Sequence, residues 1–190
     1  MANTAIVPPN LLIEPGFLYW STLLTAVPTN TVVASKYTDT WPVGWVPLGP
    51  TESGTDFSYT TTVSKIEVAE LYDPVAFRTT AREGHFGFAL ANVTAANLTR
   101  ALNGAINTVT GTGGTQSTQI TPVTPGNETR AQIGWESFDS SVRIVAFQIF
   151  NSGELKLSAN KAPAKVTIPW MANFEVPALG GPPWSIWTTR

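Results

Sequence analysis

Few residues of this chain could support catalysis, and none of them forms a catalytic pattern. His85 is the only histidine, and no G-x-S-x-G nucleophile motif accompanies it. Glu67 and Glu70 could act as an acid and base pair, but an odd spacing in a strand sends two side chains to opposite faces. The chain contains no cysteine, which excludes thiolate chemistry. We therefore expect a protein that is not an enzyme and has no catalytic, metal-binding or cofactor-binding residues.

Nucleic-acid, phosphate and membrane binding are also poorly supported. Residues 111–114 are rich in glycine, but neither a lysine nor a helix start follows them, so a mobile loop fits better than a phosphate-binding loop. The net charge of −2 and the lack of like-charge runs argue against a surface that grips a nucleic-acid backbone. Because the apolar runs are too short to cross a bilayer, we expect no membrane insertion.

Tryptophan is the more unusual feature. Four tryptophans fall in segments that read as a loop or a tail: Trp41, Trp45, Trp184 and Trp187. They could anchor the core, form contacts between protein subunits, where tryptophan concentrates, or make a stacking platform for sugars. A sugar platform would suit a secreted protein, yet the first residues lack the basic region and unbroken apolar core of a signal peptide. We therefore expect synthesis in a cytoplasm.

Composition indicates one folded domain over residues 1–190. Apolar residues make up 43% of the chain, which is enough for a core, whereas charged residues make up only 13%. A folded protein with so few charges is expected to have much of its surface covered. Copies of the same chain are the simplest candidate for that cover.

The positioning elements are predicted to be mainly strands. Large side chains alternate with small or polar ones over 57–63 and 86–90, which is the period of a half-buried strand. Residues 130–138 and 142–150 read as a hairpin, and residues 165–176 as a last strand. These patterns predict a sheet protein.

One short helix is expected at about residues 94–103. Thr94 can cap its start, and Gly104 is the usual residue just past a helix end. The spacing predicts that one stripe packs on the sheet (Leu98, Ala101 and Leu102) and that another faces water (Asn97, Arg100 and Asn103).

Four segments are predicted to lie outside the regular elements. Proline and glycine punctuate an N-terminal arm at 1–16, a long loop at 34–56 and a C-terminal arm at 177–190. Residues 108–128 are rich in threonine, glycine and proline, and they read as a flexible loop or a loose hairpin.

Four stretches carry a resemblance to a known family through their order along the chain. They are residues 45–57 (WVPLGPTESGTDF), residues 66–70 leading to Pro74, the strand at Phe86 with the helix ending at Gly104, and residues 167–169 with 174–175. In this order they resemble the major tail protein, or tail tube protein, of long non-contractile-tailed bacteriophages, particularly those with actinobacterial hosts. The tryptophan-bearing tail and residues 170–173 depart from the family pattern.

The resemblance implies a β-sandwich or half-barrel subunit with a flanking helix. Six subunits would form a ring whose inner strands join into one barrel, and rings would stack into a tube. The expected partners are other copies of the chain, the tape-measure protein, the tail terminator and the distal tail or baseplate proteins. Double-stranded DNA would pass through without specific binding. The protein would be a structural component of the virion, made in the host cytoplasm.

Candidate sites follow from this resemblance. Acidic residues on the expected middle strands are candidates for the lumen face: Glu67, Glu70, Asp73 and Glu83. The long loop and the two arms, with their four tryptophans, are candidates for contacts between subunits or rings. Two alternatives remain at this point: a tail terminator or baseplate ring protein of the same fold, and a secreted carbohydrate-binding β-sandwich.

Overall fold

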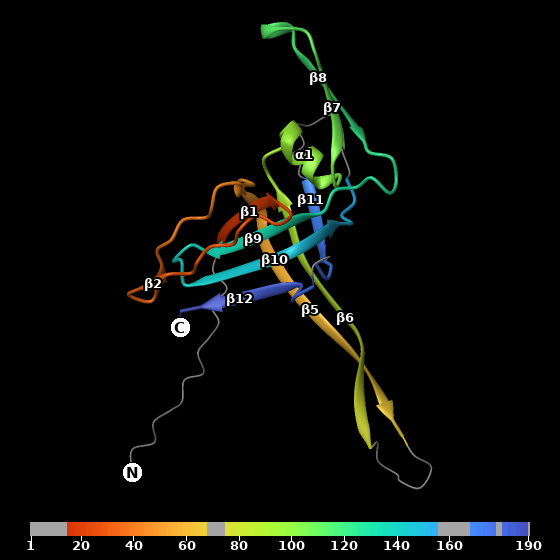
Figure 1. Ribbon diagram of the computed structural model, residues 1–190. Coiled ribbons are helices and arrows are strands. Elements are labelled where there is room, and N and C mark those ends of the chain that lie inside the picture. Colours follow the sequence, from red (N-terminus) through yellow and green to blue (C-terminus); the bar gives the residue numbers. More distant parts are fainter. Residues whose placement is uncertain (1–14, 68–74, 156–167, 178–179, 190) are drawn as a thin grey trace.

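The fold is mainly antiparallel β. It was obtained as a computed structural model that describes residues 15–67, 75–155, 168–177 and 180–189. The main sheet follows the order β4-β1-β9-β10-β11-β6-β5, and β12 pairs with β10 beside this path. Within the described residues, a single short α-helix, α1 (Ala95–Ala101), flanks the sheet (Figure 1). The sheet curls as a half-barrel does, so the predicted fold class is confirmed.

The strands differ greatly in length. The main sheet contains β1 (Gly16–Thr22), β4 (Val46–Pro47), β5 (Thr51–Ile66), β6 (Ala76–Leu90), β9 (Ala131–Ser137), β10 (Val142–Asn151), β11 (Ile168–Phe174) and β12 (Trp184–Thr188). Two small antiparallel pairs lie outside it: β2 (Val32–Val33) with β3 (Lys36–Tyr37), and β7 (Ala105–Thr110) with β8 (Ser117–Pro122). A 3-10 turn, η1 (Gly113–Thr115), lies between β7 and β8.

The predicted hairpin of β9 and β10 forms the centre of the sheet. Arg143 lies opposite Glu136, and Val145 opposite Gly134. Every residue of β9 is buried, because the apolar core covers one face and the segment after β1 covers the other. A side chain at Gly134 would collide with the Trp41 ring, which shows how closely that segment packs on β9.

The C-terminal segment contains a strand of the sheet. β12 pairs with the first half of β10, from Val142 opposite Thr188 to Ala146 opposite Trp184, and β11 pairs with the second half. The prediction of an extended arm over 177–190 is therefore wrong for β12. Local sequence could not show this, because the strand forms only where β10 leaves an edge open.

Removing residues 177–190 is expected to lower the free energy of unfolding by about 2 kcal/mol or more. The truncation uncovers the edge of β10 and removes the Trp184 ring, which packs edge-on against Phe57 and Tyr59 at centroid distances of 5.2 Å. Urea denaturation of the truncated and full-length chains measures the change. An unchanged midpoint would restore the interpretation of this segment as an independent arm.

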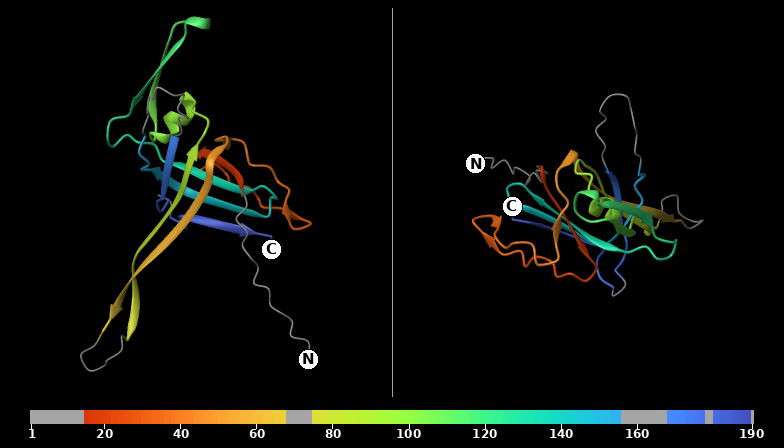
Figure 2. Two further views of the ribbon diagram at one scale, coloured as in Figure 1. Left: turned by 180° about the vertical axis from the view of Figure 1, so that it is seen from behind. Right: turned by 90° about the horizontal axis from the view of Figure 1, so that it is seen from above.

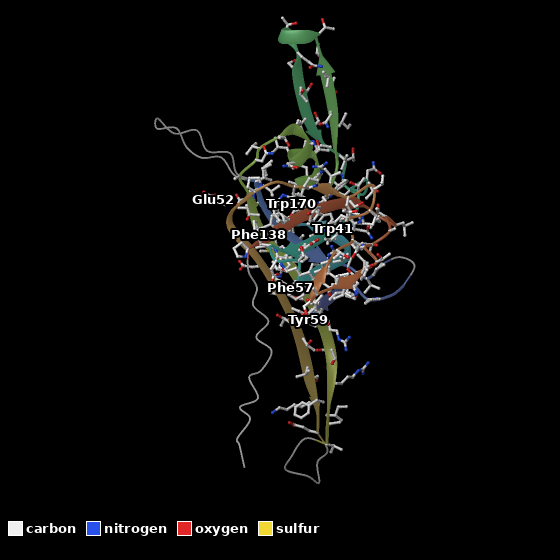
Figure 3. The ribbon with its side chains drawn as sticks, turned by 90° about the vertical axis from the view of Figure 1, so that its left-hand side faces the viewer. Trp41, Glu52, Phe57, Tyr59, Phe138 and Trp170 are labelled. Carbon is white, nitrogen blue, oxygen red and sulfur yellow. The ribbon has the colours of Figure 1, made fainter. Side chains whose placement is uncertain are left out.

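β5 and β6 form the longest hairpin, and it projects well beyond the rest of the sheet (Figures 1 and 2). Near the sheet, Phe86, Phe88 and Leu90 are buried, and the small residues between them are half-buried, as the alternation predicts. Figure 3 shows Phe57 and Tyr59 where the hairpin leaves the body of the subunit. Farther from the body of the subunit, residues 60–67 and 75–83 of the hairpin are exposed.

The helix forms almost as predicted, but one of its three polar residues that were expected to face water is buried. The Thr94 hydroxyl accepts a hydrogen bond from the Asn97 backbone N–H, and Leu102 is the C-cap. Leu98 and Ala101 pack on the core as expected, whereas Leu102 is half-buried. Asn97 is buried because its amide donates to the backbone oxygens of Leu48 and Asn92. The remaining two predicted water-facing residues, Arg100 and Asn103, are half-buried.

Two segments predicted to lie outside the regular elements contain strands, and for 108–128 the alternative prediction of a hairpin is confirmed. The flexible loop at 108–128 is largely the β7–β8 hairpin, whose register runs from Ala105 opposite Pro122 to Thr110 opposite Ser117. The long loop at 34–56 contains β3 and β4, and its last residues belong to β5. Of the N-terminal arm, residues 1–14 lie outside the described residues, and Gly16 already begins β1.

Candidate functional site

The outer half of the β5–β6 hairpin carries exposed apolar side chains. The exposed fractions are 54% for Val63, 46% for Ile66, 56% for Val75 and 63% for Phe77. We call these four residues the hairpin tip. An isolated two-stranded hairpin is at best marginally stable in water, and exposed apolar groups on it gain free energy when they are covered. The hairpin tip is therefore a candidate contact surface.

A β-bulge determines which side chains share a face of this hairpin. Thr62 lies opposite Ala81 and Val63 opposite Thr79, so Thr80 has no cross-strand partner in the ladder. The extra residue moves Phe77 to the face that carries Val63. Two large apolar groups are thereby brought to one face of the hairpin, whereas Ile66 lies on the other.

β5 also presents a long unpaired edge. It has 16 residues and ends the sheet, with β6 as its only ladder partner among the described strands. A long edge strand exposes a row of backbone N–H and C=O groups that can pair with another chain. The same strand therefore offers both hydrogen-bonding groups and an apolar tip.

A second hairpin projects at the opposite end of the subunit. Figure 1 shows β7–β8 extending away from α1, at the end opposite the β5–β6 hairpin. Its exposed apolar residues are Ile106 (60%) and Val109 (52%). The subunit thus carries an exposed apolar hairpin at each end.

The four acidic residues predicted to face the lumen do not share one position in the fold. Glu83 is exposed on β6 and lies opposite Thr60, on the face that also carries His85 and Ser58. Glu67 is exposed just after β5, near the hairpin tip, so its predicted position on a middle strand is wrong. Glu83 lies on β6, which stands between β11 and β5 in the sheet order, although the ladder with β11 covers only residues 85–90 of that strand. Glu70 and Asp73 lie outside the described residues.

The face around Glu83 is small and polar. Between Asp56 and Thr62 it is formed by cross-strand pairs of Asp56 with Gly87, Ser58 with His85, Thr60 with Glu83 and Thr62 with Ala81. This section contains two carboxylates and no lysine or arginine. It is the face of β5–β6 opposite Phe57 and Phe86, which pack into the core.

The four candidate interface tryptophans pack within the subunit. Trp45 is buried, and Trp41 stacks on Tyr19 at 4.4 Å and contacts Trp45 edge-on at 4.7 Å. Trp184 and Trp187 lie half-buried on β12, where Trp187 packs against Phe147. The rings thus anchor the long loop and β12 to the sheet within the subunit. Their contacts with other subunits stay a prediction, since Trp41, Trp184 and Trp187 are only half-buried.

Arg143 is the main charged anchor of that long loop. It is 1% exposed and forms ion pairs with Glu136 (Nε to Oε2, 3.1 Å) and Asp39 (Nη1 to Oδ2, 3.0 Å). Its second terminal nitrogen donates to the Asp39 backbone oxygen at 2.6 Å. The Trp41 indole donates to the same Glu136 oxygen at 2.6 Å. A single buried guanidinium thus joins the loop to β9 and β10.

The Asp39 carboxylate should make folding sensitive to acid. Burial opposes its ionisation, but hydrogen bonds from the Asn30 backbone and the Arg143 charge prevail and hold the pKa of Asp39 below its ordinary value of 3.8. A lowered folded-state pKa stabilises the fold above the unfolded-state pKa, and this contribution is lost as pH falls through the folded-state pKa. Asp39→Asn should therefore be destabilising at pH 7, by an amount that shrinks below about pH 5.

Urea titrations of the wild type and Asp39→Asn from neutral to acid pH measure this difference. Asp56→Asn, at an exposed aspartate of β5, is the matched control and should change stability little at any pH. A constant difference between Asp39→Asn and the wild type at all pH values would contradict the ionic role of Asp39.

Residues with catalytic potential are not brought together. The Ser58 hydroxyl lies 3.1 and 3.2 Å from the two ring nitrogens of His85, and both side chains are half-buried on the β5–β6 hairpin. Across the described ranges, no group of three or more histidine, aspartate or glutamate side chains could hold a metal ion. No helix in the described part of the chain is long and apolar enough to cross a membrane.

Comparison with known proteins gives no assignment. No protein-family model matches the chain, and a search of curated protein sequences finds no significant match. The candidate site therefore rests on the geometry described above.

Sequence patterns did not identify the main residues of the hairpin tip or of the buried ion pairs. Val63 was seen only as part of an alternating strand, and Phe77 and Arg143 were not singled out. A signal for Phe77 was present, because an apolar ring between Ala76 and Arg78 is unusual on an exposed strand. No local pattern marks Arg143, since its partners lie up to 113 positions away.

Proposed function

We propose that the protein is the tail tube subunit of a long non-contractile-tailed bacteriophage and assembles as stacked hexameric rings. The observation that carries the proposal is β5, a 16-residue edge strand that ends in an apolar tip. Pairing β5 with a strand of the neighbouring subunit removes a long edge that would otherwise promote aggregation. Repeated around a ring, this pairing closes the sheets into one barrel.

Stacking of rings is supported by the two projecting hairpins. They extend from opposite ends of the subunit, so the end of one ring can meet the other end of the next. Contacts between two different surfaces repeat without limit when the rotation does not close. The resulting tube would house the tape-measure protein, join the tail terminator and distal tail proteins, and conduct DNA from capsid to cell. Its location would be the virion.

Of the two faces of the β5–β6 hairpin, the polar face around Glu83 is the better candidate to line the lumen of the tube, since the other face packs into the core. DNA carries one negative charge for about every 1.7 Å of its axis, so a face without basic residues would let it slide. Replacing Glu83 by lysine adds a ring of positive charge in each hexamer. We expect Glu83→Lys virions with intact tubes but slowed DNA ejection.

Electron microscopy of the mutant tails and an ejection assay measure these two results. Glu154→Lys is a matched control, because Glu154 is exposed and lies outside the β5–β6 hairpin. Ejection from Glu83→Lys virions at the wild-type rate would remove Glu83 from the lumen.

The alternatives receive less support. A carbohydrate-binding sandwich that stacked sugars on its tryptophans would need them exposed, but none of the seven tryptophans is exposed. A terminator or baseplate protein stops after one ring, whereas apolar hairpins at both ends of the subunit favour continued stacking.

A further inference from the structure

A pocket of about 440 Å³ lies between β1, α1 and β11, away from the β5–β6 hairpin. Its walls include Trp20 from β1, Arg100 and Thr99 from α1, Arg130 just before β9, and Trp170 from β11. Figure 3 shows Trp170 within the body of the subunit. The volume is in the range that holds a small organic molecule or a single large side chain.

The pocket is lined by two arginines, of which Arg130 forms an ion pair and Arg100 does not. The lining contains two arginines and no aspartate or glutamate. Arg130 is neutralised by Glu175, with 2.7 Å between Nε and Oε2. Arg100 instead lies over the Trp20 ring, 4.9 Å from its centroid, and donates to the neutral Asn97 amide at 2.9 Å. No carboxylate within the described residues pairs with Arg100.

The two tryptophans that line the pocket have buried indole nitrogens. The indole nitrogens of Trp20 and Trp170 are both buried and have no hydrogen-bond partner among the described residues. Buried indole N–H groups usually find an acceptor, so two unpaired ones beside one pocket are unusual. Burial also lowers the pKa of Arg100, because it removes part of the guanidinium from water. The apolar wall atoms of Trp20, Trp170 and Ile149 complete the pocket.

We infer that this pocket binds a carboxylate carried on an apolar body. The carboxylate would pair with Arg100, and the apolar body would lie against the tryptophan rings. Arginine binds carboxylates through two parallel hydrogen bonds, and the partly buried site strengthens that interaction. The same chemistry can come from a free organic acid or from an acidic side chain of a second copy. The inference does not depend on the proposed tube.

Isothermal titration calorimetry with 4-phenylbutyrate and its neutral amide tests the pocket. We expect one acid to bind per chain, and the amide to bind at least about tenfold more weakly, because it cannot form the charged pair. Arg100→Gln should weaken acid binding by a similar factor, and Arg100→Lys should restore part of it. Arg78→Gln, which removes an exposed charge from the outer β5–β6 hairpin, should bind as the wild type does. Unfolding midpoints confirm that each variant is folded.

Sedimentation distinguishes the two sources of the carboxylate. If the group comes from a second copy, the acid but not the amide should reduce self-association, and Arg100→Gln should self-associate less without any ligand. If it comes from a free acid, binding should leave the sedimentation coefficient unchanged. Equal binding of acid and amide, or an acid that neither binds nor alters self-association, would overturn the inference.

Discussion

Replacing Arg143 by alanine is expected to lower the free energy of unfolding by about 3–5 kcal/mol. The change leaves the Glu136 and Asp39 carboxylates without their shared cation, and their side chains are only 10% and 16% exposed. It also removes the guanidinium stacked over Tyr37, 4.8 Å from the ring centroid, and so loosens the long loop from β9. Urea denaturation followed by tryptophan fluorescence measures the loss, because Trp41 and Trp45 report on the same loop.

The matched control is Arg78→Ala, which removes the same side chain at an exposed position of β6 and should change stability by less than about 0.5 kcal/mol. A triple variant with Arg143→Met, Glu136→Gln and Asp39→Asn should recover part of the loss, because no buried charge is left unpaired. If Arg143→Ala were no more destabilising than Arg78→Ala, the buried ion pairs would not anchor the loop.

Placing aspartates at Val63 and Phe77 is expected to abolish assembly without unfolding the subunit. Both side chains are more than half exposed, so the isolated fold loses little by the change. If both are buried between copies, each contributes roughly 1.5–3 kcal/mol, and two introduced charges add a desolvation cost. Because 1.4 kcal/mol corresponds to tenfold in affinity, the concentration needed for assembly should rise on the order of 100-fold or more.

Sedimentation velocity across a concentration series measures that shift. Aspartates at Leu24 and Val43 are the control, since these apolar residues are 79% and 100% exposed but lie outside both projecting hairpins. Equal assembly of the two double variants would remove the hairpin tip from the interface.

Local patterns in the sequence predict much of the fold. Strand alternation at Phe86, Phe88 and Leu90 appears in the structure because one face of β6 packs on the core. Thr94 caps the start of the helix, where backbone N–H groups lack partners within the helix. Gly104 follows the end of the helix in a left-handed conformation, with a φ of 97°, which glycine adopts readily. These features depend on neighbours in the chain, so periodicity and capping chemistry are sufficient to find them.

The rest of the fold depends on contacts between distant segments. Asn97 is polar and was expected in water, but it is buried by a hydrogen bond to Leu48, 49 positions away. β12 forms only because β10 leaves half of one edge open. The long loop is held by Arg143, 104 positions from Asp39. No local pattern encodes these distances.

The candidate assembly surface was less predictable than the fold. The strand pattern located β5, but its place at the edge of the sheet is a property of the whole topology. The bulge at Thr80 brings Phe77 to the face of Val63, and a simple alternation would have placed it on the other face. The tryptophans of the predicted loop and tail pack within the subunit, because a segment that reads as a loop in sequence can still lie against a sheet.

Negative-stain electron microscopy of the purified full-length protein tests the tube subunit account most directly. The account predicts hollow tubes or stacked rings of one diameter for the wild type, and dispersed subunits for the variant with aspartates at Val63 and Phe77. Dispersed subunits for the wild type at every concentration, with no difference from that variant, would contradict it.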